Sequence, residues 1–290
     1  MFKGTATAII TPFDDNLDID YTSLDKFVEF QLTNEIDSLV VLGTTGEAPT
    51  IELNEREKII DSVVQKVNGK VPVIVGTGTN NTKDVAEFNK IAEKYNANGL
   101  LIVNPYYNKG TQSSIIEHYK FISERTYLPI ILYNVASRTG INLLPDTVLK
   151  IQQDCKNVIG IKEASGDINQ IAKLCANKPD NFLVYSGNDD QALPIIALGG
   201  VGVISTTSNV FPKQMHLLTK TALEGDFENA RSIHNKLLNF MNDLFIETNP
   251  TPVKFAVSYL GYCKNTLRLP MSAASANTMA IIKSHIDSLR

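Results

Sequence analysis

Short apolar runs recur along the chain at nearly even intervals. Their centres lie about 28 residues apart, close to the length of one βαβ unit. Runs of four or five residues rich in β-branched side chains predict strands buried on both faces rather than helices. The runs occupy residues 6–10, 39–42, 71–75, 100–103, 130–133, 158–161, 182–185 and 201–204.

The segments between these runs carry apolar residues at helical spacing. The segment 82–95, for example, places Val85 and Phe88 on one face. Asn54 and Glu57 are spaced as a capping box, which predicts that a helix begins there. The chain therefore alternates predicted strands with predicted helices.

This alternation predicts an α/β fold, a (β/α)8 TIM barrel with a C-terminal helical extension. A doubly wound open sheet is the alternative, but even spacing and the lack of a linker favour a closed barrel. Strand patterns stop near residue 225, and helical patterns continue over residues 227–245, 251–260 and 272–289. We expect a barrel catalytic domain at residues 1–225 and the extension at residues 226–290.

Composition narrows the classes of function. The 290 residues are 43% hydrophobic and carry a formal net charge of −4, which is ordinary for a soluble globular protein. No basic cluster indicates a nucleic acid or membrane surface as partner. No apolar run reaches the roughly 18 residues that a membrane span needs, so we expect a cytoplasmic protein.

Cysteine and histidine positions argue against disulfides and metal sites. The three cysteines are widely spaced, and the four histidines fall in helical stretches without metal-ligand spacing. We therefore expect no metal. The chemistry must come from other side chains.

Active sites of such barrels lie at the C-terminal ends of the strands. Lys162 follows the sixth apolar run, and strand alternation turns Gly160 and Lys162 toward the barrel interior. An interior ammonium without a partner is costly, which favours the neutral amine that forms Schiff bases with carbonyl substrates. The alternative is a lysine that reaches solvent from the strand end.

Other strand ends supply groups suited to a small carboxylate. The turn at residues 43–46, Gly-Thr-Thr-Gly, offers hydroxyls and backbone N–H groups, although a plain βα turn has the same pattern. Tyr106, Tyr107 and Tyr133 can relay protons or simply line a pocket. Arg138 can bind a carboxylate with two hydrogen bonds or form a surface ion pair.

Five motifs, in order and spacing, resemble the dihydrodipicolinate synthase family over essentially the whole chain. The family consists of pyruvate-dependent class I aldolases of lysine and diaminopimelate biosynthesis. The resemblance implies condensation of pyruvate with L-aspartate 4-semialdehyde to 4-hydroxy-tetrahydrodipicolinate, through a covalent Schiff base and without a cofactor. The motifs are Gly43-Thr44-Thr45-Gly46-Glu47, Pro105-Tyr106-Tyr107, Tyr133-Asn134-Val135, Gly160-Ile161-Lys162-Glu163 and Leu267-Arg268-Leu269-Pro270.

The resemblance also implies the catalytic residues. Lys162 would form the Schiff base with pyruvate. Thr44, Tyr107 and Tyr133 would relay the proton that converts imine to enamine. Tyr107 is expected to act in the site of a neighbouring subunit, so the resemblance implies a homo-oligomer, a dimer of dimers.

Substrate-binding residues follow from the same resemblance. Thr45 would bind the pyruvate carboxylate, mainly through its backbone N–H, and Arg138 the carboxylate of aspartate semialdehyde. Gly187 and Ile204 would contact the keto acid through their backbones. Ala136 stands where the family usually has proline, a change expected to loosen the Arg138 loop without removing the arginine.

Feedback inhibition is where the chain departs most from the family. Lysine-sensitive members carry two histidines in the helix after the second strand, where this chain has Leu53 and Arg56. Asn80 and Tyr106 match that allosteric site, and Asp84 replaces a glutamate. An added cation at position 56 disfavours a cationic effector, so we expect weak or absent lysine inhibition.

Two other functions compete with this interpretation. An N-acetylneuraminate lyase-like aldolase could use the same scaffold, but a sugar-cleaving site favours hydroxyl-binding partners over Arg138. A non-catalytic barrel could bind small carboxylates as a sensor. Binding alone would not need the amine of Lys162 beside Tyr133, Tyr107 and Thr44, which counts against a sensor.

Overall fold

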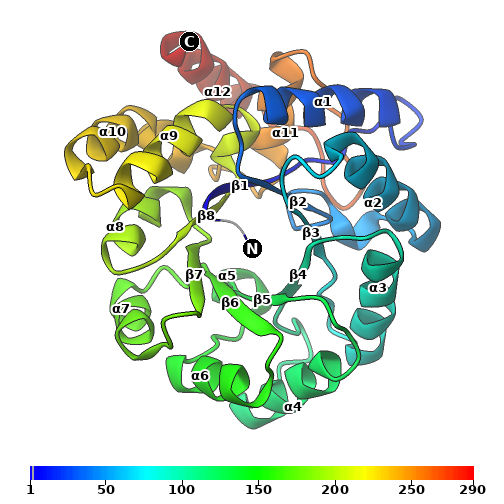
Figure 1. Ribbon diagram of the computed structural model, residues 1–290. Helices are drawn as coiled ribbons and strands as arrows, with labels where there is room; N and C mark the ends of the chain where they lie inside the picture. Colours follow the sequence, from blue (N-terminus) through cyan, green and yellow to red (C-terminus); the bar gives the residue numbers. More distant parts are fainter. Residues whose placement is uncertain (2) are drawn as a thin grey trace.

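The computed structural model describes Met1 and residues 3–290, and these residues form a closed barrel of eight parallel strands in chain order (Figure 1). β1 pairs with both β2 and β8, so the sheet closes and an open sheet is excluded. The strands are β1 (Gly4–Ala8), β2 (Ser38–Val41), β3 (Val73–Gly76), β4 (Gly99–Val103), β5 (Ile130–Asn134), β6 (Val158–Glu163), β7 (Leu183–Ser186) and β8 (Gly202–Ser205).

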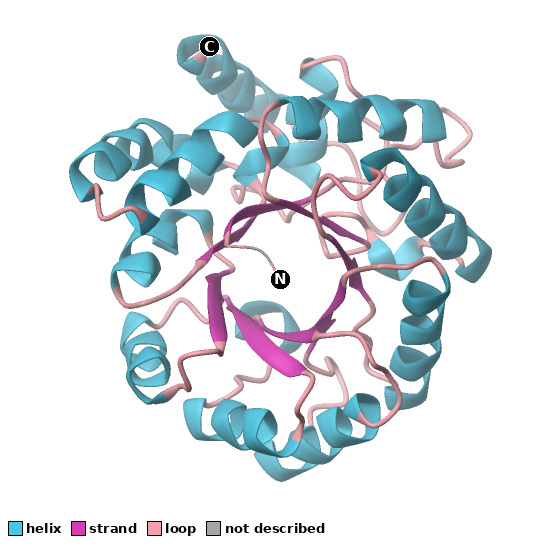
Figure 2. Ribbon diagram, in the orientation of Figure 1, coloured by secondary structure: helices cyan, strands magenta, loops and turns pink. Residues whose placement is uncertain are grey.

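Helices form a ring outside the strands (Figure 2). The one-turn α5 (Ala136–Thr139) is not part of this ring: it follows β5 at the strand ends, where the sequence pattern indicated a loop. The barrel helices are α1 (Tyr21–Thr33), α2 (Leu53–Val67), α3 (Thr82–Lys94), α4 (Gln112–Ser123), α6 (Pro145–Asp154), α7 (Ile168–Asn177), α8 (Ala192–Ala197) and α9 (Pro212–Leu223). Short 3₁₀ turns follow β2, β7 and β8 at η1 (Ala48–Thr50), η2 (Asp189–Gln191) and η3 (Thr207–Asn209).

The predicted capping box of α2 is wrong by two residues. α2 begins at Leu53, and the Glu55 carboxylate accepts the backbone N–H of Glu52 at 2.9 Å. The sequence offers two overlapping capping boxes, Glu52 with Glu55 and Asn54 with Glu57. The first of them forms. Asn54 therefore lies inside the first turn rather than at the cap.

Strand side chains alternate between two apolar layers. In β2, Leu39 and Val41 join the layer between sheet and helices, whereas Val40 joins the layer inside the barrel. In β6, Ile161 faces the helices. Lys162 therefore faces the interior, as the alternation predicted.

The C-terminal extension consists of α10 (Phe227–Asp243), α11 (Thr251–Tyr259) and α12 (Ala276–Leu289). α10 packs on α9, and α12 packs on both α10 and α11. The fold is the predicted TIM barrel with a helical extension, while the domain boundary at residue 225 stays a prediction. Among the described residues, no helix is long and apolar enough to cross a membrane.

Candidate active site

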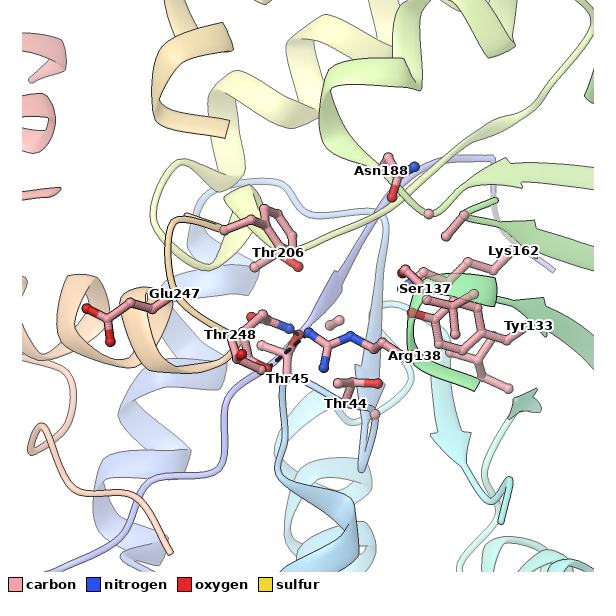
Figure 3. A pocket seen from close by; sticks show the side chains of 18 of the residues that line it. Thr44, Thr45, Tyr133, Ser137, Arg138, Lys162, Asn188, Thr206, Glu247 and Thr248 are labelled. Carbon is pink, nitrogen blue, oxygen red and sulfur yellow. Dashed lines mark hydrogen bonds between the residues drawn. The ribbon is translucent and has the colours of Figure 1, made fainter. Parts of the chain in front are cut away.

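A cavity of about 500 Å³ opens at the C-terminal ends of the strands (Figure 3). Its lining comes from strand ends around the barrel and from residues 245–249 of the extension. The structure therefore brings together predicted residues that lie far apart in the sequence. Those that line the cavity are Thr44, Thr45, Tyr133, Arg138, Lys162 and Gly187.

Lys162 lies on β6 in register with Tyr133 of β5. Its Nζ is 4.4 Å from the centre of the Tyr133 ring, and 6% of the residue is exposed. Within the described chain Lys162 has no carboxylate partner. A Cβ at Gly187 would lie 3.1 Å from Lys162 Cε, so the glycine leaves room for the lysine side chain. The amine is thus held inside the cavity without a fixed counter-ion.

The turn after β2 lines the same cavity and carries backbone donors. Two of its carbonyls are occupied, because Gly43 O accepts from Gly46 N at 3.1 Å and Thr44 O accepts from Glu47 N at 3.1 Å. The N–H groups of Thr44 and Thr45 have no acceptor within the described residues. Free backbone donors in a turn of this kind bind small anions.

Arg138 lies on α5, whose turn is closed by Gly140 in the left-handed region at φ 71°. The Gly140 N–H donates to Ala136 O at 2.9 Å. The guanidinium lines the cavity and donates one bond, from Nη2 to Asn249 O at 3.2 Å. Its remaining N–H groups are available for a carboxylate. The expected effect of Ala136 on this loop stays a prediction.

Polar side chains behind the cavity connect β5 to β6. Asn134 and Glu163 are in register, and Asn134 Nδ2 lies 3.1 and 3.2 Å from the two Glu163 carboxylate oxygens. Ser165 N also donates to Glu163 at 2.7 Å. Burial raises the pKa of Glu163, and these hydrogen bonds oppose the rise. The network fixes the strand ends that carry Tyr133 and Lys162.

Two predicted residues lie outside the cavity lining. Tyr107 is 89% exposed, with φ at 70° on the loop after β4. Ile204 is fully buried inside the barrel. A single chain therefore does not bring Tyr107 to Lys162.

The predicted allosteric residues separate into two groups. Arg56 and Tyr106 line a second cavity of about 470 Å³, which adjoins the first because Thr44, Tyr133 and Arg138 line both. The other two, Asn80 and Asp84, are not part of its lining.

Residues 245–249 of the extension are part of the site that sequence reasoning missed. Asn249 Nδ2 donates to Thr45 Oγ1 at 3.0 Å, and its carbonyl accepts from Arg138. The Asn249-Pro250 dipeptide marks a turn in the sequence. Nothing in the sequence pattern places that turn over the barrel mouth. Among the described residues, no group of three or more His, Cys, Asp or Glu is placed to hold a metal ion.

Comparisons with known proteins agree with this geometry. The model of the Dihydrodipicolinate synthetase family matches residues 1–288. The 4-hydroxy-tetrahydrodipicolinate synthase of Thermotoga neapolitana is 51% identical over 98% of this chain and 97% of its own.

Solved structures show the same fold. Dihydrodipicolinate synthase from Thermotoga maritima superposes with a TM-score of 0.98 at 47% identity, covering 100% of this chain and 99% of that one. The Acinetobacter baumannii enzyme, solved with pyruvate, has a TM-score of 0.97 at 36% identity and covers 100% and 99% of the two chains. The chain therefore belongs to the dihydrodipicolinate synthetase family.

Proposed function

We propose that the protein condenses pyruvate with L-aspartate 4-semialdehyde to give 4-hydroxy-tetrahydrodipicolinate, in lysine and diaminopimelate biosynthesis. The observation that carries the proposal is the Lys162 amine, held without a counter-ion in a cavity that also presents free turn N–H groups. Family membership supports the choice of substrates. The reaction is that of a class I aldolase and uses no cofactor.

The first half of the reaction activates pyruvate. The Lys162 amine attacks the pyruvate ketone, and loss of water leaves an imine. The N–H groups of the turn at Thr44 and Thr45 hold the carboxylate, while Gly187 and Ile204 contribute backbone contacts. A proton then leaves the methyl group through the hydroxyls of Tyr133 and Thr44, giving the enamine.

The second half forms the new carbon–carbon bond. The enamine carbon attacks the aldehyde of aspartate semialdehyde, whose carboxylate is held by Arg138. The amino group of that substrate then attacks the imine carbon and displaces Lys162, which closes the ring. One water is released overall, and the enzyme returns to its starting state.

The test is chemical trapping alongside a substrate comparison. Borohydride with pyruvate should add one reduced pyruvate to Lys162, located by mass spectrometry of the digested protein. A condensation assay with aspartate semialdehyde should show turnover, and a sialic-acid cleavage assay should show none. An adduct on another lysine, or no adduct, contradicts the mechanism, and sialic-acid cleavage favours the rival lyase.

Tyr107 completes the relay of a neighbouring subunit in a homo-oligomer, a dimer of dimers in the cytoplasm. Its exposure and its place outside the cavity lining support action across an interface. Mixing Tyr107→Phe and Lys162→Ala subunits should regain about a quarter of wild-type activity, since half the dimers then hold one intact site. No regain on mixing contradicts action in trans.

Lysine inhibits this enzyme weakly or not at all. The Arg56 guanidinium lies 4.4 Å from the Phe88 ring centre and donates to Ile51 O at 3.2 Å and to Ala48 O. A fixed cation in the second cavity repels the ammonium groups of lysine. Assays over a range of lysine concentrations test this, and strong inhibition below millimolar lysine contradicts it.

A further inference from the structure

The Thr44–Thr45 turn is followed by a buried ion pair that the reaction does not use. Glu47 ends the turn in the left-handed region at φ 56°. Its Oε1 lies 2.8 Å from Nζ of Lys254 on α11, and the two side chains are 1% and 0% exposed. The pair therefore joins the barrel to the extension directly behind the turn.

Lys254 is surrounded by oxygen atoms as an ammonium requires. Its Nζ donates to Thr11 O at 2.6 Å and to Thr266 O at 3.2 Å, besides its contact with Glu47. Burial lowers the pKa of Lys254, and the Glu47 carboxylate opposes that change. Three oxygen atoms thus surround the Lys254 ammonium, two as hydrogen-bond acceptors and one as its ion-pair partner.

The other Glu47 oxygen reaches the last motif of the sequence. Glu47 Oε2 accepts the backbone N–H of Arg268 at 3.1 Å. The Phe13 ring lies near both cations, 4.4 Å from Lys254 Nζ and 4.5 Å from Arg268 Cζ. Glu47 thus links the turn motif at residues 43–47 to the last motif, residues 267–270, for which the catalytic steps have no use.

Every residue of the turn from Thr45 to Glu47 is anchored toward β1 or the extension. Thr45 Oγ1 accepts from Asn249, and Gly46 O accepts from Thr11 Oγ1 at 2.7 Å. A buried ion pair stabilises a fold no better than an apolar pair of the same volume, but its contacts are directional. Such directional anchors fix backbone N–H groups that must face a substrate.

We propose that Glu47 and Lys254 are positioning residues, which hold the Thr44–Thr45 turn so that its backbone N–H groups face the pyruvate carboxylate. This inference rests on the role proposed above for that turn. It also assigns the extension a part in pyruvate binding. Neither side chain touches the reacting atoms.

The test separates positioning from stability by replacing both partners. Either Glu47→Met or Lys254→Met leaves one buried charge unpaired, so each should lower the melting temperature of the full-length protein. The double variant buries no charge and should recover most of that loss. Its KM for pyruvate should still be about tenfold above wild type, because directional anchoring is absent. Its KM for aspartate semialdehyde should change less than about twofold, since Arg138 is unaffected.

A matched control removes another side-chain contact between helices of the extension. Asp243→Asn removes the contact of Asp243 with His285, 2.6 Å apart and outside the cavity lining. It should lower stability slightly and leave the pyruvate KM unchanged. A double variant that recovers both stability and pyruvate KM overturns the inference. If it does not recover stability, Glu47→Gln decides the matter, because it keeps the shape but has one acceptor oxygen where Glu47 uses two. An unchanged pyruvate KM in that variant overturns the inference.

Hydrogen exchange distinguishes failure of this inference from failure of the proposed function. Pyruvate should slow amide exchange at residues 43–47 of the wild-type protein, and slow it less in the double variant. No slowing in the wild type contradicts the proposed role of the turn itself. Equal slowing in both proteins overturns only the positioning role of Glu47 and Lys254.

Discussion

Two lysines are buried among the residues that the structure describes, and they differ in what surrounds them. Lys162 is 6% exposed and Lys254 is 0% exposed, and each Nζ lies 4.4 Å from the centre of an aromatic ring, that of Tyr133 or Phe13. Lys254 also has the Glu47 carboxylate and two carbonyl oxygens around it. Lys162 has no such partners within the described residues.

The comparison shows that burial alone does not make a nucleophile. An ammonium surrounded by fixed acceptors is stabilised in its charged form and has no free lone pair. An amine that faces an open cavity and has no fixed acceptor around it can reach a carbonyl carbon. The acceptors around each nitrogen therefore separate a catalytic lysine from a structural one.

The largest expected effect comes from removing the amine of the catalytic lysine. Lys162→Ala should lower kcat by at least about 1,000-fold, because no imine can form. Its unfolding free energy should stay within about 1 kcal/mol of wild type, since the side chain faces a cavity. Steady-state assays and urea unfolding measure both. Residual turnover within tenfold of wild type would place the nucleophile elsewhere.

Lys254→Met should mainly lower stability, whereas Lys162→Ala should mainly lower activity. It leaves Glu47 as an unpaired buried charge, so the free energy of unfolding should fall by about 3–5 kcal/mol. Chemical denaturation at neutral pH measures the loss. The folded fraction should still form the borohydride adduct on Lys162. If that adduct disappears while the protein stays folded, the two lysines are not separable as structural and catalytic.

Arg138 adds a third cation to the comparison of the two lysines. It lines the same cavity as Lys162, but it is expected to bind a substrate rather than react with it. Arg138→Ala should raise the KM for aspartate semialdehyde by about 10- to 100-fold, through loss of its charged hydrogen bonds. Trapping of pyruvate on Lys162 should be unchanged. Initial-rate kinetics with each substrate varied in turn give the answer, and an increase confined to the pyruvate KM would reverse the assignment of the two carboxylates.

His118 is also buried, and we expect it to lower the stability of the protein at acidic pH. Its Nδ1 lies 2.9 Å from Thr82 Oγ1, its Nε2 is buried without a partner among the described residues, and burial lowers the pKa of His118 from 6.5 to about 4. The unfolded state therefore binds more protons below pH 6.5, so stability should fall as the pH drops from 6.5 toward 4. The full loss is about 3 kcal/mol.

Unfolding of wild type and His118→Gln at pH 7, 5 and 4 checks this dependence. The variant should lose less stability between pH 7 and 4 than the wild type. Parallel pH curves for the two proteins would assign the acid sensitivity to other groups.

Local pattern was enough to predict most of the fold. Eight apolar runs at even spacing became eight strands, and alternation along β6 turned Lys162 inward as predicted. The start of a helix was predicted wrongly where two capping patterns overlapped: the capping box of α2 forms at Glu52 and Glu55 rather than at Asn54 and Glu57. α5 escaped prediction because a one-turn helix has no apolar period.

Site residues could be predicted only where they come directly after a strand in the sequence. The lysine, tyrosine and threonines at strand ends could be identified because a closed barrel brings those ends together. Asn249 could not, since its place over the cavity depends on how the extension folds back. The partners of Lys254 come from residues 11, 47 and 266, and no local pattern relates them.

The sequence by itself determined the barrel, the inward direction of Lys162 and the family to which the chain belongs. These follow from the short-range periodicity of apolar residues and from motifs that can be recognised in the amino-acid sequence. Only the tertiary structure decided which lysine is paired and which is free. That difference depends on oxygen atoms that distant segments place around Lys254, because a buried charged group needs hydrogen-bonding partners and no local pattern supplies them.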